Sequence, residues 1–124
     1  MDMRGSVWAG LLAIFAACLG SGGAAAQNNY GAIAYSPSTK AIGWAYDYGS
    51  RAAAEDAALV NCRKQANDCV THWFYNACAA LAVGPAGYGM AWGADRRIAE
   101  SNAIRSCQRW TMDCEIKQWV CTTR

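Results

Sequence analysis

Residues 32–37 read Ala-Ile-Ala-Tyr-Ser-Pro, and residues 80–85 read Ala-Leu-Ala-Val-Gly-Pro. Each run is a short apolar stretch that ends in a proline turn signal, which is typical of the first strand of a hairpin. Four later pairs of residues are each 45 positions apart: Arg51 and Arg96, Glu55 and Glu100, Cys62 and Cys107, Cys69 and Cys114. The fixed spacing predicts one domain made of two copies of a single unit, which we place at residues 30–78 and 79–124.

Each copy is expected to fold as strand, strand, helix, strand. The predicted hairpins pair residues 33–35 with 42–46 and residues 81–83 with 88–92. We expect Ser50 and Asp95 to cap the two helices, because their side-chain oxygens accept hydrogen bonds from first-turn amides. Residues 70–75 and 115–121 predict the final strands. The predicted fold is an α+β domain with pseudo-twofold symmetry, in which two helices pack on one face of a shared antiparallel sheet.

Alanines on one face of each predicted helix indicate that the helices lie close to the sheet. A helix brings residues four apart onto the same face, and small side chains there let the two backbones approach. The residues of these two faces are Ala54, Ala58 and Cys62 in the first copy, and Ala99, Ala103 and Cys107 in the second.

The first 26 residues have the three parts of a signal peptide. Arg4 supplies positive charge, residues 7–19 are an apolar stretch, and Ala24-Ala25-Ala26 gives the small residues of a cleavage site. The apolar stretch is shorter than the roughly 20 residues of a membrane-spanning helix, so we expect a secreted or periplasmic protein without a transmembrane helix. One alternative stays open, because Phe15-Ala16-Ala17-Cys18 loosely resembles a lipoprotein box in which Cys18 would carry a lipid anchor.

Six cysteines follow the predicted signal peptide, and an even number in an exported chain favours disulfides. Sequence alone permits many pairings, but the repeat symmetry favours Cys62–Cys69 and Cys107–Cys114, each joining a helix end to the next strand. Cys78–Cys121 would then tie the two copies together. The spacings differ from the tight CxxC pairs of zinc sites, so we expect neither a metal nor any other cofactor.

The run from Tyr30 to Pro37, the Ser50-Arg51-Ala52-Ala53-Ala54-Glu55 segment and the paired cysteines closely resemble the DUF4189 family of exported bacterial proteins. The likeness covers nearly all of the chain after the signal peptide, and the motifs occur in family order. Two departures are Tyr30, where the family often has Trp, and Ala79, where it often has Gly. The resemblance implies export but no activity, since the family is named for having no established function. Some relatives are regarded as exported effectors.

Catalytic groups are scarce in this sequence. A hydrolase generally needs a base that is oriented by a second group, and His72 is the one histidine, with Asp68 the nearest acid. Asp47 with Glu55, or Asp95 with Glu100, could supply the two carboxyl groups that a glycosidase needs. Helix capping and the repeat already account for most of these residues. We therefore expect no enzymatic activity. A weak hydrolase that uses His72 remains the alternative.

The net charge of +2 is too small for a nucleic-acid footprint, so we expect no nucleic-acid partner. Exposed Trp and Tyr side chains anchor protein interfaces and stack on sugars, although the same rings would otherwise build the core over the helices. The leading hypothesis is an exported binding module for a protein or glycan, one version being an inhibitor of a wall-degrading enzyme. A structural role as a cell-envelope lipoprotein is the third possibility. The candidate surface comprises Trp44, Tyr46, Tyr48, Trp92, Arg51 and Arg96.

Overall fold

The two copies of the repeat fold into the same succession of elements in the computed structural model, which describes residues 28–123. The predicted signal peptide and Cys18 lie outside these residues. The expected order of two ββαβ units is confirmed, and both final strands have the expected bounds. The elements are β1 (Tyr30–Tyr35), β2 (Ile42–Tyr48), α1 (Arg51–Arg63), β3 (Val70–Tyr75), β4 (Cys78–Gly84), β5 (Gly87–Gly93), α2 (Arg96–Cys107) and β6 (Glu115–Cys121).

Both helices begin at the residues that the sequence indicates. Ser50 Oγ accepts a hydrogen bond from the Ala53 amide at 3.1 Å, and Asp95 Oδ1 accepts one from the Ile98 amide at 2.9 Å. These bonds satisfy amides that have no partner within the first helical turn. The buried side chains of the helices are the six that the alanine pattern predicts: Ala54, Ala58, Cys62, Ala99, Ala103 and Cys107.

The strands form two antiparallel sheets of three strands, in the orders β2-β1-β3 and β5-β4-β6. The α+β class and the repeated unit are confirmed, but the units do not share one sheet as we expected. The reason lies in the central strands β1 and β4, which carry apolar residues on both faces. Each sheet therefore buries one face under its own helix and the other against the second sheet.

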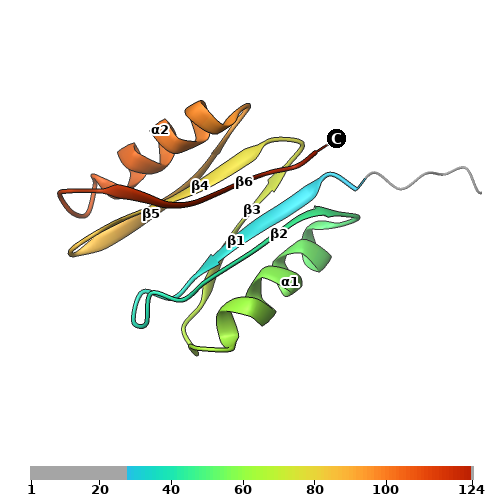
Figure 1. The fold of residues 1–124 in the computed structure, drawn as a ribbon, viewed down its shortest axis with the longest axis horizontal. Coiled ribbons are helices and arrows are strands. Elements are labelled where there is room, and N and C mark those ends of the chain that lie inside the picture. The colour runs from blue at the N-terminus through green and yellow to red at the C-terminus, as the bar shows by residue number, and fades with distance from the viewer. Residues whose placement is uncertain (1–27, 124) are drawn as a thin grey trace, which may run out of the picture.

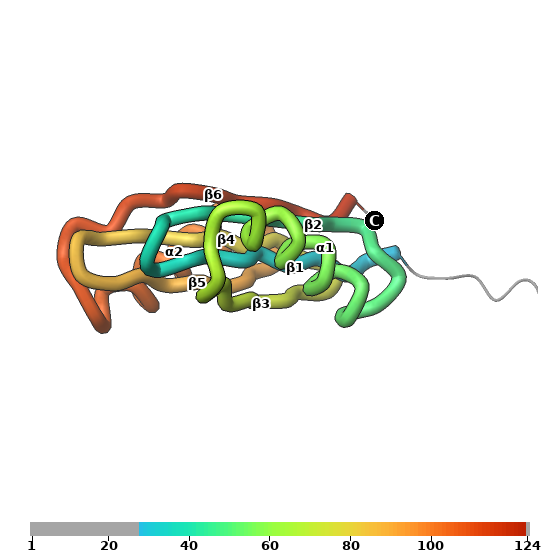
Figure 2. Tube along the Cα trace, turned by 90° about the horizontal axis from the view of Figure 1, so that it is seen from below, coloured from blue at the N-terminus to red at the C-terminus, as the bar shows by residue number. Residues whose placement is uncertain are grey.

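The result is four layers, with α1 and α2 on opposite outer sides and the two sheets between them (Figure 1). The core between the sheets is formed by Ile33, Tyr35 and Phe74 from one sheet and Ala79, Leu81 and Val120 from the other. Strand β2 contacts β6, and β3 contacts β5, so the sandwich has two edges that the pseudo-twofold axis relates. Figure 2 shows these edges on opposite sides of the molecule.

Three disulfides join Cys62 to Cys69, Cys107 to Cys114 and Cys78 to Cys121. The third does not tie the two units together as we expected. Cys78 is the first residue of β4, one position before the predicted start of the second unit, and it is the direct partner of Cys121 in the β4–β6 ladder. Their bond therefore lies within the second unit. In the first unit, Tyr30 and Tyr75 are partners at the matching place, and their ring centroids are 4.8 Å apart. The units are held together by the apolar core between the sheets and by polar contacts at its edges.

Candidate binding clefts at the sheet edges

The three aromatic residues that β2 contributes to the candidate surface are exposed, but they do not share one face of the strand. The exposed fractions of Trp44, Tyr46 and Tyr48 are 45%, 46% and 39%. Trp44 lies opposite Ile33 in the register, on the face toward the second sheet, whereas Tyr48 lies opposite Tyr30, on the face toward α1. A register shift between these positions and the positive φ of Asp47 mark a bulge. One extra residue in a strand turns the following side chains to the other face.

A cleft with a volume of about 720 Å³ lies along the opposite edge of the sandwich. Its lining comprises residues 71–75 of β3, Arg51 and Glu55 of α1, and Trp92 of β5. Trp92 is 57% exposed, and Trp73 and Tyr75 are also exposed. The cleft therefore combines three accessible aromatic rings with one charged pair, and it unites Arg51 and Trp92 from the predicted surface.

Arg51 contacts two neighbours in this cleft, and one of them is held in turn by Thr71. Its guanidinium carbon lies 4.8 Å from the centroid of the Trp73 ring, and its Nε donates to Glu55 Oε1 at 3.3 Å. The Thr71 hydroxyl donates to the other oxygen of Glu55 at 3.0 Å. A cation over an indole face is attracted by the ring quadrupole, so Arg51 holds the Trp73 ring in place. Trp73 is not among the residues of the predicted surface, so the fold adds it to the site.

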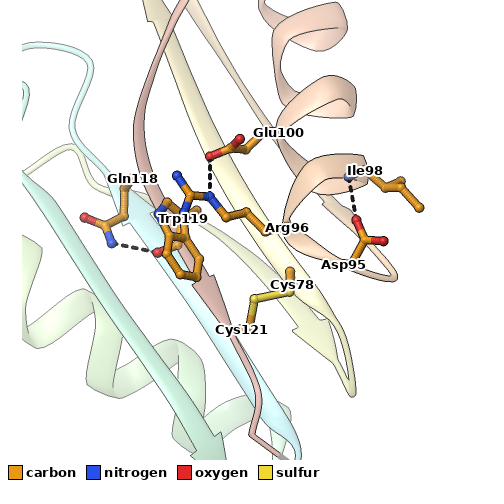
Figure 3. Close-up of polar contacts among 8 residues, drawn as sticks. All are labelled: Cys78, Asp95, Arg96, Ile98, Glu100, Gln118, Trp119 and Cys121. Atoms are coloured by element: carbon orange, nitrogen blue, oxygen red, sulfur yellow. Dashed lines mark hydrogen bonds and ion pairs between the residues drawn. A yellow bond between two sulfur atoms is a disulfide. The ribbon is translucent and has the colours of Figure 1, made fainter.

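The second unit repeats this arrangement on the other edge. Arg96 lies 4.2 Å above the Trp119 ring and donates to Glu100 at 3.0 Å (Figure 3). A shallower cleft of about 500 Å³ is lined there by residues of α2 and β6, including Lys117 and Gln118. Arg96 therefore lies at the β2–β6 edge, together with Trp44 and Tyr46. The structure divides the predicted surface between two edges and does not make it one patch.

His72 lies at the β3–β5 edge, and its Nε2 atom is buried without a hydrogen-bond partner among the described residues. Burial lowers the pKa of its imidazole, so the ring is neutral at pH 7. The acid nearest in sequence, Asp68, instead accepts hydrogen bonds from the Ser36 hydroxyl at 2.5 Å and the Ser38 amide at 3.1 Å. The hydrogen bond from Ser36 is the main cause that lowers the pKa of Asp68. The residue pair proposed for hydrolysis is therefore not assembled.

The cleft continues past His72 along β5 and α2. Two adjoining hollows include His72 in their lining, one with Trp92, Arg105 and Arg109, and the other with Met90 and Trp110. Asn102 of α2 donates to the carbonyl oxygen of Trp92 at 3.0 Å at this edge. The two arginines are not among the predicted site residues, because only the fold brings them to a hollow that His72 of β3 also lines.

The sequence profile described as "Domain of unknown function (DUF4189)" matches residues 30–121, which include both units and all three disulfides. The chain belongs to the DUF4189 family. This DUF4189 domain is also similar to the NMR structure of Rv1813c from Mycobacterium tuberculosis, with 28% sequence identity and a TM-score of 0.59. The similarity covers 96% of this chain and 97% of that one. A comparison with curated proteins found no match.

Neither helix within residues 28–123 has the length and apolar character that crossing a membrane requires. No group of three histidine, cysteine or acidic side chains that could hold a metal ion occurs in the same residues.

Proposed function

We propose that this domain is a non-enzymatic binding module that engages a protein or glycan partner through the aromatic cleft along β3. The observation that carries the proposal is the union of Trp92, Trp73 and Tyr75 with the Arg51–Glu55 pair in one cleft. Accessible aromatic rings and arginines contribute much of the binding energy at protein interfaces, and the same rings stack on sugars. No comparable set lines the cleft on β6, where Trp119 is the one aromatic side chain.

A site of action outside the reducing cytoplasm is part of the proposal. Three disulfides in so small a domain are typical of secreted and periplasmic proteins, since cytoplasmic thiols are kept reduced. The predicted signal peptide agrees with this location. The mass of the native protein distinguishes cleavage after Ala26 from a lipid on Cys18.

The environment of His72 supports binding over hydrolysis. A general base must reach the proton that it removes and is normally oriented by a partner group. Within residues 28–123 no group bonds to Nε2 of His72, and its lowered pKa makes it a weak base. We therefore expect the unaltered domain to hydrolyse none of the glycans or peptides that it binds.

Two repeat-equivalent rings provide the test. Tyr46 and Trp92 occupy matching positions in β2 and β5, are both exposed, and lie on opposite edges of the sandwich. The ¹⁵N-labelled domain is titrated with chito-oligosaccharides and with short synthetic peptides, and indole and amide NMR shifts are followed. Trp92→Ala should weaken binding at least tenfold, which corresponds to about 1.4 kcal/mol, because it removes a wall of the cleft.

Tyr46→Ala is the matched control and should change the affinity less than twofold. Equal effects of the two substitutions, or shifts confined to β2 and β6, would place the binding surface elsewhere. Hydrolysis of a probe that His72→Ala abolishes would favour the enzyme alternative.

A further inference from the structure

We infer that the partner of this cleft is an extended, acidic peptide segment of another protein, which adds to the first sheet as a fourth strand beside β3. The inference rests on the proposed function and specifies the ligand class. Strand addition uses main-chain hydrogen bonds for affinity and alternate side chains for specificity.

The cleft follows the edge of β3 itself. Successive side chains of a strand point to opposite faces of the sheet. A hollow on one face would therefore contact alternate residues, yet the lining includes the consecutive residues 71–75. The cleft consequently runs along the open side of the strand, with α1 on one flank and Trp92 of β5 on the other.

Main-chain groups of β3 are available along this line. The Asn76 amide donates to the Asn29 carbonyl at 2.9 Å, which fixes the phase of the β1–β3 ladder. In an antiparallel pair the hydrogen-bonded positions alternate, so residues 70, 72 and 74 bond to β1. The amides and carbonyls of Thr71, Trp73 and Tyr75 point outward, and no hydrogen bond from elsewhere in residues 28–123 reaches them.

The other three edges carry features that oppose strand addition. The pairing of β6 with β4 has a register shift between Leu81 and Ala82 of β4, and β6 carries the charged residues Glu115 and Lys117. Strand β2 has its own bulge, and Asp47 there accepts hydrogen bonds from the amide and hydroxyl of Thr123. Strand β5 has its Trp92 carbonyl occupied by Asn102. Bulges, charges and covering groups are the means by which proteins protect edge strands.

Strand β3 has none of these features. Its register with β1 is continuous over all six residues. It contains no proline, no acidic residue, no lysine and no arginine, and its one histidine, His72, is neutral. Because the pseudo-twofold axis relates β3 to β6, the contrast arises between two copies of the same strand. An unprotected regular edge in a cleft is suited to an added strand.

The flanks of the cleft favour a single peptide over a second copy of the domain. Edge-to-edge pairing of two copies would bring together two strands that each lie between Arg51 and Trp92, so the flanking side chains would meet first. A single extended segment meets no such obstacle. This geometry makes the second copy an alternative outcome of the test.

The positive charge beside the cleft indicates which side chains the added peptide segment carries. Arg51 is paired with Glu55, but the adjoining hollow holds Arg105 and Arg109 and no carboxylate lines it. Side chains of an added strand that face the second sheet would lie beside His72, Trp92 and these arginines. Apolar and acidic residues at alternate positions complement that wall, and small polar residues suit the Thr71 and Glu55 side.

Hydrogen exchange of the oxidised domain, read by NMR, tests strand addition directly. The probe is the acetylated and amidated hexapeptide Thr-Glu-Thr-Val-Thr-Glu, compared with a Thr-Lys-Thr-Val-Thr-Lys counterpart and with an analogue N-methylated at its three threonines, whose amides would face β3. The acidic peptide should slow exchange of the Thr71, Trp73 and Tyr75 amides at least tenfold. The lysine peptide should bind at least fivefold more weakly at low salt, and the N-methylated analogue should give no protection.

Substitutions at Thr71 separate the main chain from the side chain. Thr71→Pro removes one outward amide without removing a ladder bond, so it should abolish the protection, whereas Thr71→Ala should keep it. Thermal unfolding checks that both variants fold, and if the proline variant does not, the N-methylated peptide carries the same comparison.

Three results would overturn the inference. One is no protection of the β3 amides by the acidic peptide at millimolar concentration, and another is equal binding of the N-methylated analogue. The third is protection that appears with protein concentration alone, which would mean that copies pair with each other. If chito-oligosaccharides shift the Trp73 and Trp92 indole signals while the peptide does nothing, strand addition fails and the binding role stands. If neither the peptides nor the chito-oligosaccharides shift or protect any signal of the cleft, strand addition and the proposed binding role both fail.

Discussion

His72 is a neutral histidine in a partly closed cleft, and this makes the stability of the domain depend on pH. Burial lowers the pKa of His72 in the folded chain, whereas an unfolded chain has a histidine pKa of about 6.5. Between these two values the unfolded chain binds more protons, so the free energy of unfolding falls as the pH drops from about 6.5 toward the folded pKa. Arg105 and Arg109 are the charged side chains that line the adjoining hollow together with His72.

Replacing His72 with glutamine, the residue at the equivalent position 118, should remove this pH dependence. We expect the free energy of unfolding of His72→Gln, measured by urea titration, to change less between pH 7.5 and pH 5 than that of the unaltered domain. Asp68 does not confuse the comparison, because its pKa is lowered from 3.8 and it titrates below this window. An identical pH slope in both proteins would show that His72 is not the responsible group.

Each helix packs on its sheet at a glycine of the second strand. A Cβ atom at Gly43 would lie 2.1 Å from the Ala58 carbonyl oxygen, and one at Gly89 would lie 2.3 Å from the Cys107 amide nitrogen. Backbone atoms cannot move aside as the end of a flexible side chain can. The close contact between helix and sheet in both units therefore depends on these glycines together with the helix alanines.

Gly43→Ala should accordingly destabilise the domain by about 1–3 kcal/mol, because α1 must shift away from β2. Gly49→Ala is the matched control, since a Cβ there has its nearest contact at 3.4 Å, and it should change stability by less than about 0.5 kcal/mol. Chemical denaturation gives both values. A tolerated Gly43→Ala would mean that the helix adjusts without loss of packing.

The three disulfides contribute unequally to the stability of the whole domain. Cys78–Cys121 closes a separation of 43 residues, and each of the other two closes a separation of 7. In the chain-entropy description the stabilisation grows with the logarithm of loop length. Both Cys62 and Cys78 are buried, so the packing lost on substitution is similar in the two pairs.

Replacing Cys78 and Cys121 together by alanine should therefore cost about 1.5 kcal/mol more than replacing Cys62 and Cys69. The comparison uses urea unfolding of the two double variants, with the Cys107 and Cys114 double variant as the control that should match the Cys62 and Cys69 variant. A larger loss from the short-loop pair would indicate that fastening α1 to β3 matters more than loop entropy.

Local and repeated signals in the sequence determined much of this protein. The helix caps at Ser50 and Asp95, the buried alanine faces and both final strands follow from residue types and spacing alone. The fixed offset of 45 residues also indicated the Cys62–Cys69 and Cys107–Cys114 bonds, and Cys78–Cys121 followed as the remaining pair. These features depend on contacts near in sequence or on the symmetry of the repeat, and both leave a direct pattern in the chain.

The tertiary structure decided how the two units meet and where the rings point. Whether two ββαβ units share a sheet or stack two sheets depends on long-range burial of the second faces of β1 and β4. The bulge at Asp47 moved Tyr48 away from Trp44, and the sandwich brought Trp92 of one unit beside Arg51 of the other. Contacts between residues distant in sequence carry no periodic signal, so the cleft became visible only in the folded chain.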